Sequence, residues 1–219
     1  MRGARAEDGW ECVARAIGVA APRLLRVRQV HGTACACVNG PGSIWPSDER
    51  PEADAMIATR TDVALAVQMA DCVPVLMADC QRRAVAAVHA GWRGAAAAIV
   101  ESVVHRLRSE QRVDPANLVA AVGPSIGPCC YEVGQAVRER FHARLGEAVD
   151  RWFVPGSRGS SRPHLDLWNA TRDQLISAGI PAEQIFVAAL CTACHLDIFH
   201  SYRKEGDRTG RMVGVIRRI

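Results

Sequence analysis

The clearest signal in the chain is a series of short apolar runs separated by polar residues and turn residues. Apolar runs of this length, rich in β-branched side chains and bounded by polar residues, are typical of buried strands. We expect strands over residues 63–69, 73–78, 85–88, 118–122 and 185–190, with a less regular strand over 23–31.

Other segments have the periodicity of helices. Helices are expected at residues 11–20, 95–108, 132–146 and 166–178. Gly179 is a typical stop for the last of these, because glycine adopts the left-handed conformation at a helix end without strain. Residues 39–53 and 156–163 are rich in Pro, Gly and Ser, so both should be loops, the second a flexible one.

The expected strands outnumber the helices and mostly follow one another along the chain. This order favours an α+β fold with a mixed sheet core over a doubly wound α/β sheet. The 219 residues fit a single domain, 1–219, which is long enough to bury a core without disulfide or metal staples.

Composition excludes several classes of protein. The 49% hydrophobic and 23% charged residues are ordinary globular values, and the net charge of +4 includes no basic block, so no nucleic acid or membrane partner is expected. The N-terminal residues lack the apolar core of a signal peptide, and the chain has no apolar run long enough to span a bilayer. We therefore expect a cytoplasmic protein whose nine cysteines are core residues, metal ligands or nucleophiles.

Three residues at the ends of the expected strands form a candidate metal site: His31, Cys72 and His89. Two His and one Cys are a familiar catalytic zinc set, with the fourth position open to water or substrate. A Gly or Pro follows each of the three within two residues, so the backbone can turn sharply there. The alternative for either His is a hydrogen-bonded loop residue. Asp71 is either the partner of a ligating imidazole or a turn residue.

Two arginines are candidates for binding an anion. Arg93 stands near the start of a helix, where backbone N–H groups and a guanidinium both attract negative charge; the alternative is a solvent-facing side chain. Arg203 lies in the polar, basic segment 201–204, which by itself is typical of a solvated face.

The remaining cysteines suggest no site by themselves. Cys191-Thr192-Ala193-Cys194-His195 matches the c-type haem attachment pattern, but that attachment needs an exported chain, so we expect structural thiols. The adjacent Cys129 and Cys130 are expected to pack in the core or to form a pocket wall. A zinc finger is not expected, because no second C-x-x-C or suitably spaced His pair accompanies the first.

Several motifs, in order from about residue 23 to 219, together resemble the YfiH family, which has been labelled both multicopper polyphenol oxidase (laccase domain) and purine nucleoside phosphorylase. They are Gln29-Val30-His31-Gly32, Ala70-Asp71-Cys72-Val73-Pro74-Val75, Val88-His89-Ala90-Gly91-Trp92-Arg93-Gly94, Gly123-Pro124-Ser125-Ile126-Gly127-Pro128, Cys191-Thr192, Ser201-Tyr202-Arg203 and Thr209-Gly210-Arg211.

The resemblance implies a fold, an activity and a metal. It implies a mixed β-sandwich core with flanking helices, related in fold to cysteine-hydrolase-like toxins. The implied activity is phosphorolysis of adenosine, inosine or methylthioadenosine to base and ribose 1-phosphate, with adenosine deamination as a further activity. His31, Cys72 and His89 would be the catalytic zinc ligands, at a site that copper could also occupy. Asp71, Arg93 and Arg203 are the candidates for substrate binding.

Three alternatives use the same residues. In a cysteine hydrolase of the type that edits peptidoglycan precursors, Cys72 would be the nucleophile and His89 the base, with no metal. A copper-loaded site could show polyphenol oxidase activity, although seven His with no H-x-H pair cannot supply the copper set of a true laccase. The third alternative is a metal-binding partner protein without activity.

The chain departs from the family at its start. Only about 28 residues precede the Gln29-Val30-His31-Gly32 motif, and the Thr-Arg-x-Gly-Gly-type turn and Ser-Leu-Asn-Leu-like segment usual in the family are absent. If that stretch lines the nucleoside pocket, the pocket of this chain is expected to be more open.

Overall fold

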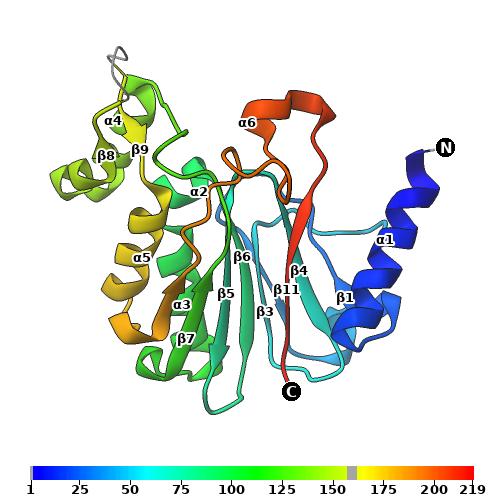
Figure 1. Cartoon of the computed structure of the whole chain (residues 1–219). Helices are drawn as coiled ribbons and strands as arrows, with labels where there is room; N and C mark the ends of the chain where they lie inside the picture. The colour runs from blue at the N-terminus through cyan, green and yellow to red at the C-terminus, as the bar shows by residue number, and fades with distance from the viewer. Residues whose placement is uncertain (1, 157–161) are drawn as a thin grey trace.

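The computed structural model describes residues 2–156 and 162–219. Its central element is a six-stranded mixed sheet in the order β10-β7-β5-β6-β3-β2 (Figure 1). The strands are β2 (Cys35–Val38), β3 (Ala55–Ala58), β5 (Val73–Asp79), β6 (Val85–Ala90), β7 (Leu118–Val122) and β10 (Ile185–Val187). Neighbours from β7 to β3 are antiparallel, whereas the outermost strands β10 and β2 pair in parallel.

A second mixed sheet packs against one face of the first. It consists of β1 (Leu24–Leu25), β4 (Ala64–Met69) and β11 (Met212–Arg217) in the order β1-β4-β11. Leu65 and Val67 of β4 share a buried apolar cluster with Met56 of β3 and with Val85 and Ala87 of β6. A separate short pair is formed by β8 (Phe153–Val154) and β9 (His164–Leu165).

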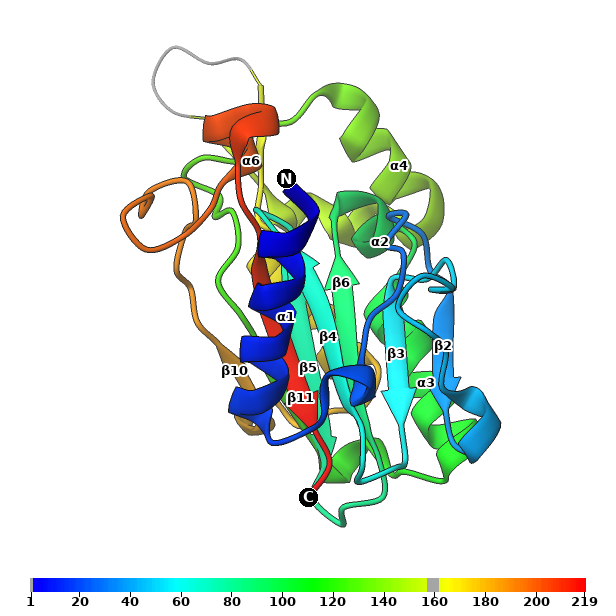
Figure 2. The same cartoon turned by 90° about the vertical axis from the view of Figure 1, so that its right-hand side faces the viewer.

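Helices cover the outer faces of both sheets (Figures 1 and 2). The helices beside the large sheet are α2 (Trp92–Ala96), α3 (Ile99–Gln111) and α5 (Leu167–Ser177), and α4 (Gln135–Leu145) packs against α2 beyond the end of the sheet. α1 (Arg2–Ile17) lies over the small sheet, where Trp10 and Val13 pack near Ala64 and Ala66. The remaining helical turns are α6 (Tyr202–Glu205) and the 3-10 segments Ala21–Arg23, Pro41–Ser43, Pro115–Asn117, Glu147–Trp152, Ala182–Gln184 and Gly206–Arg208.

This layering explains the apolar runs in the sequence. All six side chains of β6 are buried, because β6 lies in the middle of the large sheet, between the helices on one face and the small sheet on the other. Ala86 and Val88 face α3, while Val85 and Ala87 face the small sheet. In α3, Ile99, Val103 and Leu107 recur every four residues and bury one stripe against the sheet.

The fold confirms the expected mixed sheets and differs in several elements. The strands expected at 63–69, 73–78, 85–88 and 118–122 are present within about two residues. The helix expected at 95–108 is two helices, because Ala98 adopts a φ of 58° and interrupts the run. The strand expected at 23–31 is reduced to the two residues of β1, and the one at 185–190 ends at Val187.

The structure also has strands that the sequence pattern did not predict, and several predicted helices begin or end at other residues. β2, β3 and β11 were not predicted, since Cys, Ala and Gly interrupt their β-branched character. The helices at 11–20, 132–146 and 166–178 are present with shifted ends, and Gly179 has the expected positive φ, of 98°. The loop at 39–53 holds one 3-10 turn, and most of the loop at 156–163 lies outside the described residues. Within the described ranges, no helix has the length and apolar content needed to cross a bilayer.

Candidate active site and metal centre

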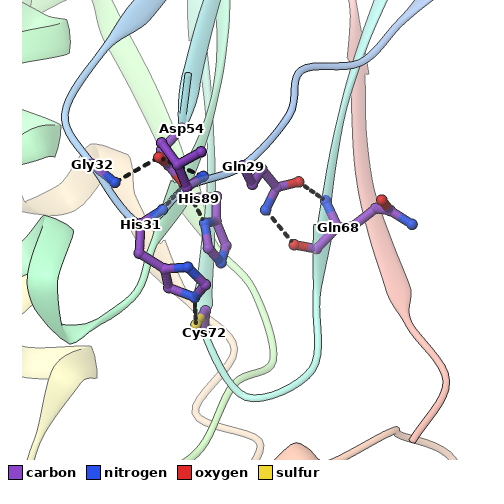
Figure 3. A network of polar contacts seen from close by, with 8 residues as sticks. Gln29, His31, Gly32, Asp54, Gln68, Cys72 and His89 are labelled. Carbon is purple, nitrogen blue, oxygen red and sulfur yellow. Dashed lines mark hydrogen bonds and ion pairs between the residues drawn. The ribbon is translucent and has the colours of Figure 1, made fainter. Parts of the chain in front are cut away.

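The structure brings His31, Cys72 and His89 together, as Figure 3 shows. One ligand atom from each lies within 4.8 Å of the others. His31 Nε2 is 3.8 Å from Cys72 Sγ, and the two imidazole rings meet edge to face with centroids 4.9 Å apart. Cys72 directly precedes β5 and His89 lies in the adjacent β6, opposite Pro74. Neighbouring antiparallel strands therefore place two of the three side chains.

His31 reaches the cluster from a turn rather than from a strand end. Its φ of 60° is uncommon for a residue with a side chain. The buried Asp54 carboxylate holds this backbone by accepting three successive N–H groups, from Val30 (3.2 Å), His31 (3.0 Å) and Gly32 (2.6 Å). The sequence interpretation of His31 as a strand-end residue is wrong, because β1 stops at Leu25.

Asp54 also fixes the orientation of His89. Its Oδ1 lies 2.8 Å from His89 Nδ1, and the two residues are 0% and 3% exposed. A proton on Nδ1 in this bond leaves Nε2 available as a ligand beside Cys72. Burial alone would raise the pKa of Asp54, but hydrogen bonds from His89 and Gly32 outweigh it and lower that pKa.

Sequence reasoning missed Asp54. The one available signal is an acid directly before the alanine-rich strand β3, in a loop that also holds Asp48, Glu49 and Glu52. Nothing nearby in the sequence links it to His31 or His89.

A second contact anchors the turn that carries His31. The Gln29 side chain donates from Nε2 to the Gln68 carbonyl and accepts the Gln68 N–H at Oε1, both at 2.8 Å (Figure 3). The Gln29 side-chain amide thus forms the two hydrogen bonds with the backbone of β4 that a neighbouring strand would form. The glutamine two positions before His31 thus ties the candidate ligand to the small sheet.

The charges within the cluster favour a thiolate. Burial alone would raise the pKa of Cys72, but hydrogen bonds from His31 and His89 lower it to about 7. Burial alone would lower the pKa of His89, but its bonds to Asp54 and Cys72 raise it to about 9. The site therefore stabilises a negative sulfur, the form that both metal binding and nucleophilic attack require.

Asp71 is a junction between three chain segments. Its Oδ1 accepts the Thr192 hydroxyl and its Oδ2 accepts the Arg203 backbone N–H, both at 2.6 Å, while its own carbonyl accepts the Ile126 N–H at 2.9 Å. It adopts a φ of 90°. Of the two roles considered from the sequence, the structure gives Asp71 the turn role, and Asp54 is the partner of the imidazole.

The cluster opens into a cavity of about 710 Å³. Asp71 is the one acidic side chain among its described lining residues, whereas the basic ones are Arg28, Arg50, Arg93, Arg203 and Arg211. The Arg93 guanidinium lies 4.5 Å from the centre of the Trp92 ring, and that of Arg203 lies 5.0 Å from the Tyr131 ring. The lining thus combines a site for an anion with aromatic surface.

Gly91 leaves the room that the cluster needs. A Cβ at this position would lie 3.0 Å from His31 Cδ2 and 3.1 Å from Cys72 Sγ. We expect Gly91→Ala to displace both side chains and to lower the kcat/KM of the reaction catalysed at this cluster by about 10–100-fold. Gly134→Ala is the matched control, because open space surrounds that position. Steady-state kinetics and metal content of both variants check this, and wild-type values for Gly91→Ala would contradict it.

Comparison with known proteins shows the family of the chain. The chain belongs to the family described as multi-copper polyphenol oxidoreductase laccase, whose model matches residues 4–219. It is 38% identical to a purine nucleoside phosphorylase of Bacteroides thetaiotaomicron over 192 residues, covering 86% of this chain and 70% of the relative.

Two further matches cover nearly the whole chain. The adenosine deaminase RL5 of an unknown prokaryotic organism is 34% identical and is matched over 98% of this chain and 82% of its own length. The crystal structure of the hypothetical protein YfiH of Bacillus licheniformis superimposes with a TM-score of 0.88 at 31% identity, covering 96% of this chain and 80% of that one. These matches confirm the resemblance drawn from the sequence motifs.

Proposed function

We propose that this chain, as a single domain over 1–219, is a zinc-dependent purine nucleoside phosphorylase. It would cleave adenosine, inosine or methylthioadenosine with phosphate to the base and ribose 1-phosphate. The observation that carries the proposal is the cluster of His31, Cys72 and His89 opening into an arginine-lined cavity. The names of its relatives support the same activity.

The donor set fits a catalytic zinc site. Two imidazoles and a thiolate are ligands that zinc prefers, and three protein ligands leave one position open. His89 already has its Nδ1 engaged by Asp54 at 2.8 Å, which is the outer contact expected of a ligating histidine. A metal bound there would act as a Lewis acid that polarises a substrate oxygen.

The cavity residues would bind and orient the two substrates. Arg93 and Arg203 are placed to hold phosphate, and Trp92 and Tyr131 offer aromatic surface to the purine. In the reaction a phosphate oxygen bonds to C1′ of the ribose as the C1′–N9 bond breaks, and the base leaves with that electron pair and takes up a proton. Asp71 would contribute to substrate binding by fixing the backbone of Arg203.

Deamination of adenosine would use the same cavity. Water adds at C6 of the purine, ammonia leaves, and inosine is the product. The relative named adenosine deaminase supports this as a second activity. Copper in place of zinc would account for an oxidase label, since the cluster is a mixed nitrogen and sulfur site. A cytoplasmic location and a relation in fold to cysteine-hydrolase-like toxins stay predictions.

A cysteine hydrolase is the second candidate, and the raised pKa of His89 is the observation that favours it, because a protonated imidazole does not bind a metal. A pKa of about 7 for Cys72 and of about 9 for His89 gives a thiolate beside an imidazolium at neutral pH. Zinc content of protein purified without added metal separates the two functions. Active protein without metal would exclude the zinc site and support the hydrolase.

Alkylation of Cys72 should show the lowered pKa directly. In metal-free protein the rate of reaction with iodoacetamide should rise with pH to half its maximum near pH 7, because only the thiolate reacts. Unfolded protein, the control, should reach half maximum near about pH 8.5. Peptide mapping follows the modified residue. Zinc-loaded protein should be protected, and rapid alkylation at the wild-type metal content would contradict zinc ligation by Cys72.

The arginines should act on phosphate more than on nucleoside. We expect Arg93→Ala and Arg203→Ala each to raise the KM for phosphate by about 10–100-fold, because each removes one hydrogen bond to a charged group. The KM for the nucleoside should change less. Arg108→Ala, an exposed residue on α3, is the control. An assay for ribose 1-phosphate across phosphate concentrations measures this. Equal changes in both KM values would assign these arginines another role.

A further inference from the structure

Four cysteines outside the candidate active site meet at one point of the fold. Cys129 and Cys130 follow the turn after β7, and Cys191 and Cys194 form the turn after β10. Their four sulfur atoms all lie within 4.8 Å of one another. Cys194 Sγ is 3.6 Å from Cys129 Sγ and 3.4 Å from Cys130 Sγ, and all four thiols are free.

These separations match those of a metal tetrathiolate. Four sulfurs bound tetrahedrally to zinc at about 2.3 Å stand about 3.8 Å from one another. A disulfide would require a sulfur separation of about 2.05 Å. The sulfur distances of 3.4 and 3.6 Å therefore lie near the spacing around a shared ion and far from that of a bond.

Core packing does not explain the arrangement. Cys129 and Cys194 are exposed and Cys130 is half-buried, so only Cys191 is a buried thiol. The sequence predicts that Cys129 and Cys130 pack in the core or form a pocket wall and that Cys191 and Cys194 are structural thiols. Taken separately, these roles do not account for four sulfurs converging near the surface. Their convergence is what a ligand set requires.

We propose that Cys129, Cys130, Cys191 and Cys194 hold a structural zinc ion, a second metal site that does not depend on the proposed phosphorylase function. Four thiolates fill the tetrahedral positions and leave none for water or substrate, so this site is structural rather than catalytic. Soft sulfur ligands select zinc over hard cations such as magnesium. The Gly127 backbone N–H donates to Cys191 Sγ at 3.3 Å and stabilises a thiolate there.

The site would fasten one wall of the cavity. Tyr131 follows Cys130 directly and lines the cavity beneath the Arg203 guanidinium. Thr192 stands between the other two ligands and donates to Asp71. An ion joining the two loops would therefore fix the segments that present Tyr131 and Arg203.

Metal analysis of variants tests the proposal. Wild-type protein should contain about two zinc ions per chain, one at each cluster. Cys72→Ala should keep about one, and the double variant Cys129→Ser/Cys194→Ser should lose the other. Cys80→Ser, at an exposed cysteine outside both clusters, should match wild type. Thermal unfolding should show a lowered Tm for the double variant, and for wild type after chelation.

Cobalt substitution gives a readout that does not need the double variant to fold. Cys72→Ala stripped of metal and loaded with Co²⁺ should show intense sulfur-to-cobalt charge-transfer absorption and the visible bands of a tetrahedral thiolate site. Four additional thiols should react with Ellman's reagent once the metal is removed. A Cys72→Ala protein that binds neither zinc nor Co²⁺ would overturn the proposal. So would a disulfide among these cysteines in protein purified without reductant, which would make them a redox pair.

Discussion

Cys72→Ala should lower the rate of nucleoside phosphorolysis by about 1,000-fold or more, which corresponds to about 4 kcal/mol in the activation barrier. Cys72 supplies the one negatively charged side chain of the three-residue cluster, so its loss leaves two neutral imidazoles to hold a dication. The same substitution should remove the metal from this cluster. A coupled assay for ribose 1-phosphate and zinc analysis of the same preparation measure both effects.

Cys80→Ala is the matched control for this variant, because Cys80 is exposed and lies at the other end of the same strand. Its rate and its zinc content should equal those of wild type. A correctly folded Cys72→Ala protein that keeps wild-type rates would remove Cys72 from the mechanism. If purified wild-type protein holds no metal and Cys72→Ala is still inactive, the result would instead support the cysteine hydrolase.

Asp54→Ala should produce the second large effect, on stability as well as on activity. The carboxylate accepts the backbone N–H groups of Val30, His31 and Gly32 and the ring of His89, and the substitution leaves these donors without an acceptor. Removing one partner of a buried charged network costs about 3–5 kcal/mol of unfolding free energy. Chemical denaturation of the two proteins measures the difference.

The conservative variant Asp54→Asn separates charge from shape. Asparagine keeps one acceptor oxygen but not the charge, and we expect zinc affinity to fall by about 10–100-fold while the fold persists. Competition with a chromophoric chelator measures the affinity. Unchanged zinc affinity in Asp54→Asn would show that Asp54 holds the turn at His31 but that its charge does not strengthen metal binding by His89.

The effect of Asp54 on stability should also depend on pH. The pKa of Asp54 is lower in the folded protein than its ordinary value of 3.8, so the stabilisation is complete above that value and is lost as the pH falls through the folded pKa. The stability difference between wild type and Asp54→Ala should therefore be largest between about pH 4 and 6.5 and shrink in acid below about pH 4. It should also fall as the pH rises from 6.5 through about 9, because the same bond raises the pKa of His89 from 6.5 to about 9. A difference that does not change on acidification would contradict a charged Asp54.

Local pattern was enough to find the centre of the fold and the three clustered residues. β5, β6 and β7 are apolar runs in the sequence, and β6 is buried on both faces, whereas β7 leaves Val119 half-buried and Ala121 exposed. Cys72 and His89 stood out as polar residues that interrupt or follow those runs. The pattern failed at β2, β3 and β11, whose small or mixed side chains become strand residues only through pairing with distant neighbours.

The contacts between distant segments could not be predicted in the same way. Asp54 precedes a short alanine-rich strand, and its link to His89 exists only because β3 pairs with β6. The four-cysteine cluster likewise depends on β10 lying beside β7, which brings the two cysteine pairs to the same edge of the sheet. Spacing rules that search within one segment do not detect ligands shared between two loops.

The most direct test of the proposed function is the release of base from adenosine by wild-type protein with and without phosphate. Chromatography of the products follows adenine, hypoxanthine, ribose 1-phosphate, ribose and inosine in one run. We expect adenine to appear only when phosphate is present, and ribose 1-phosphate to equal the sum of adenine and any hypoxanthine formed by way of inosine. Adenine and free ribose released at the same rate without phosphate would contradict it and would make the enzyme a hydrolase.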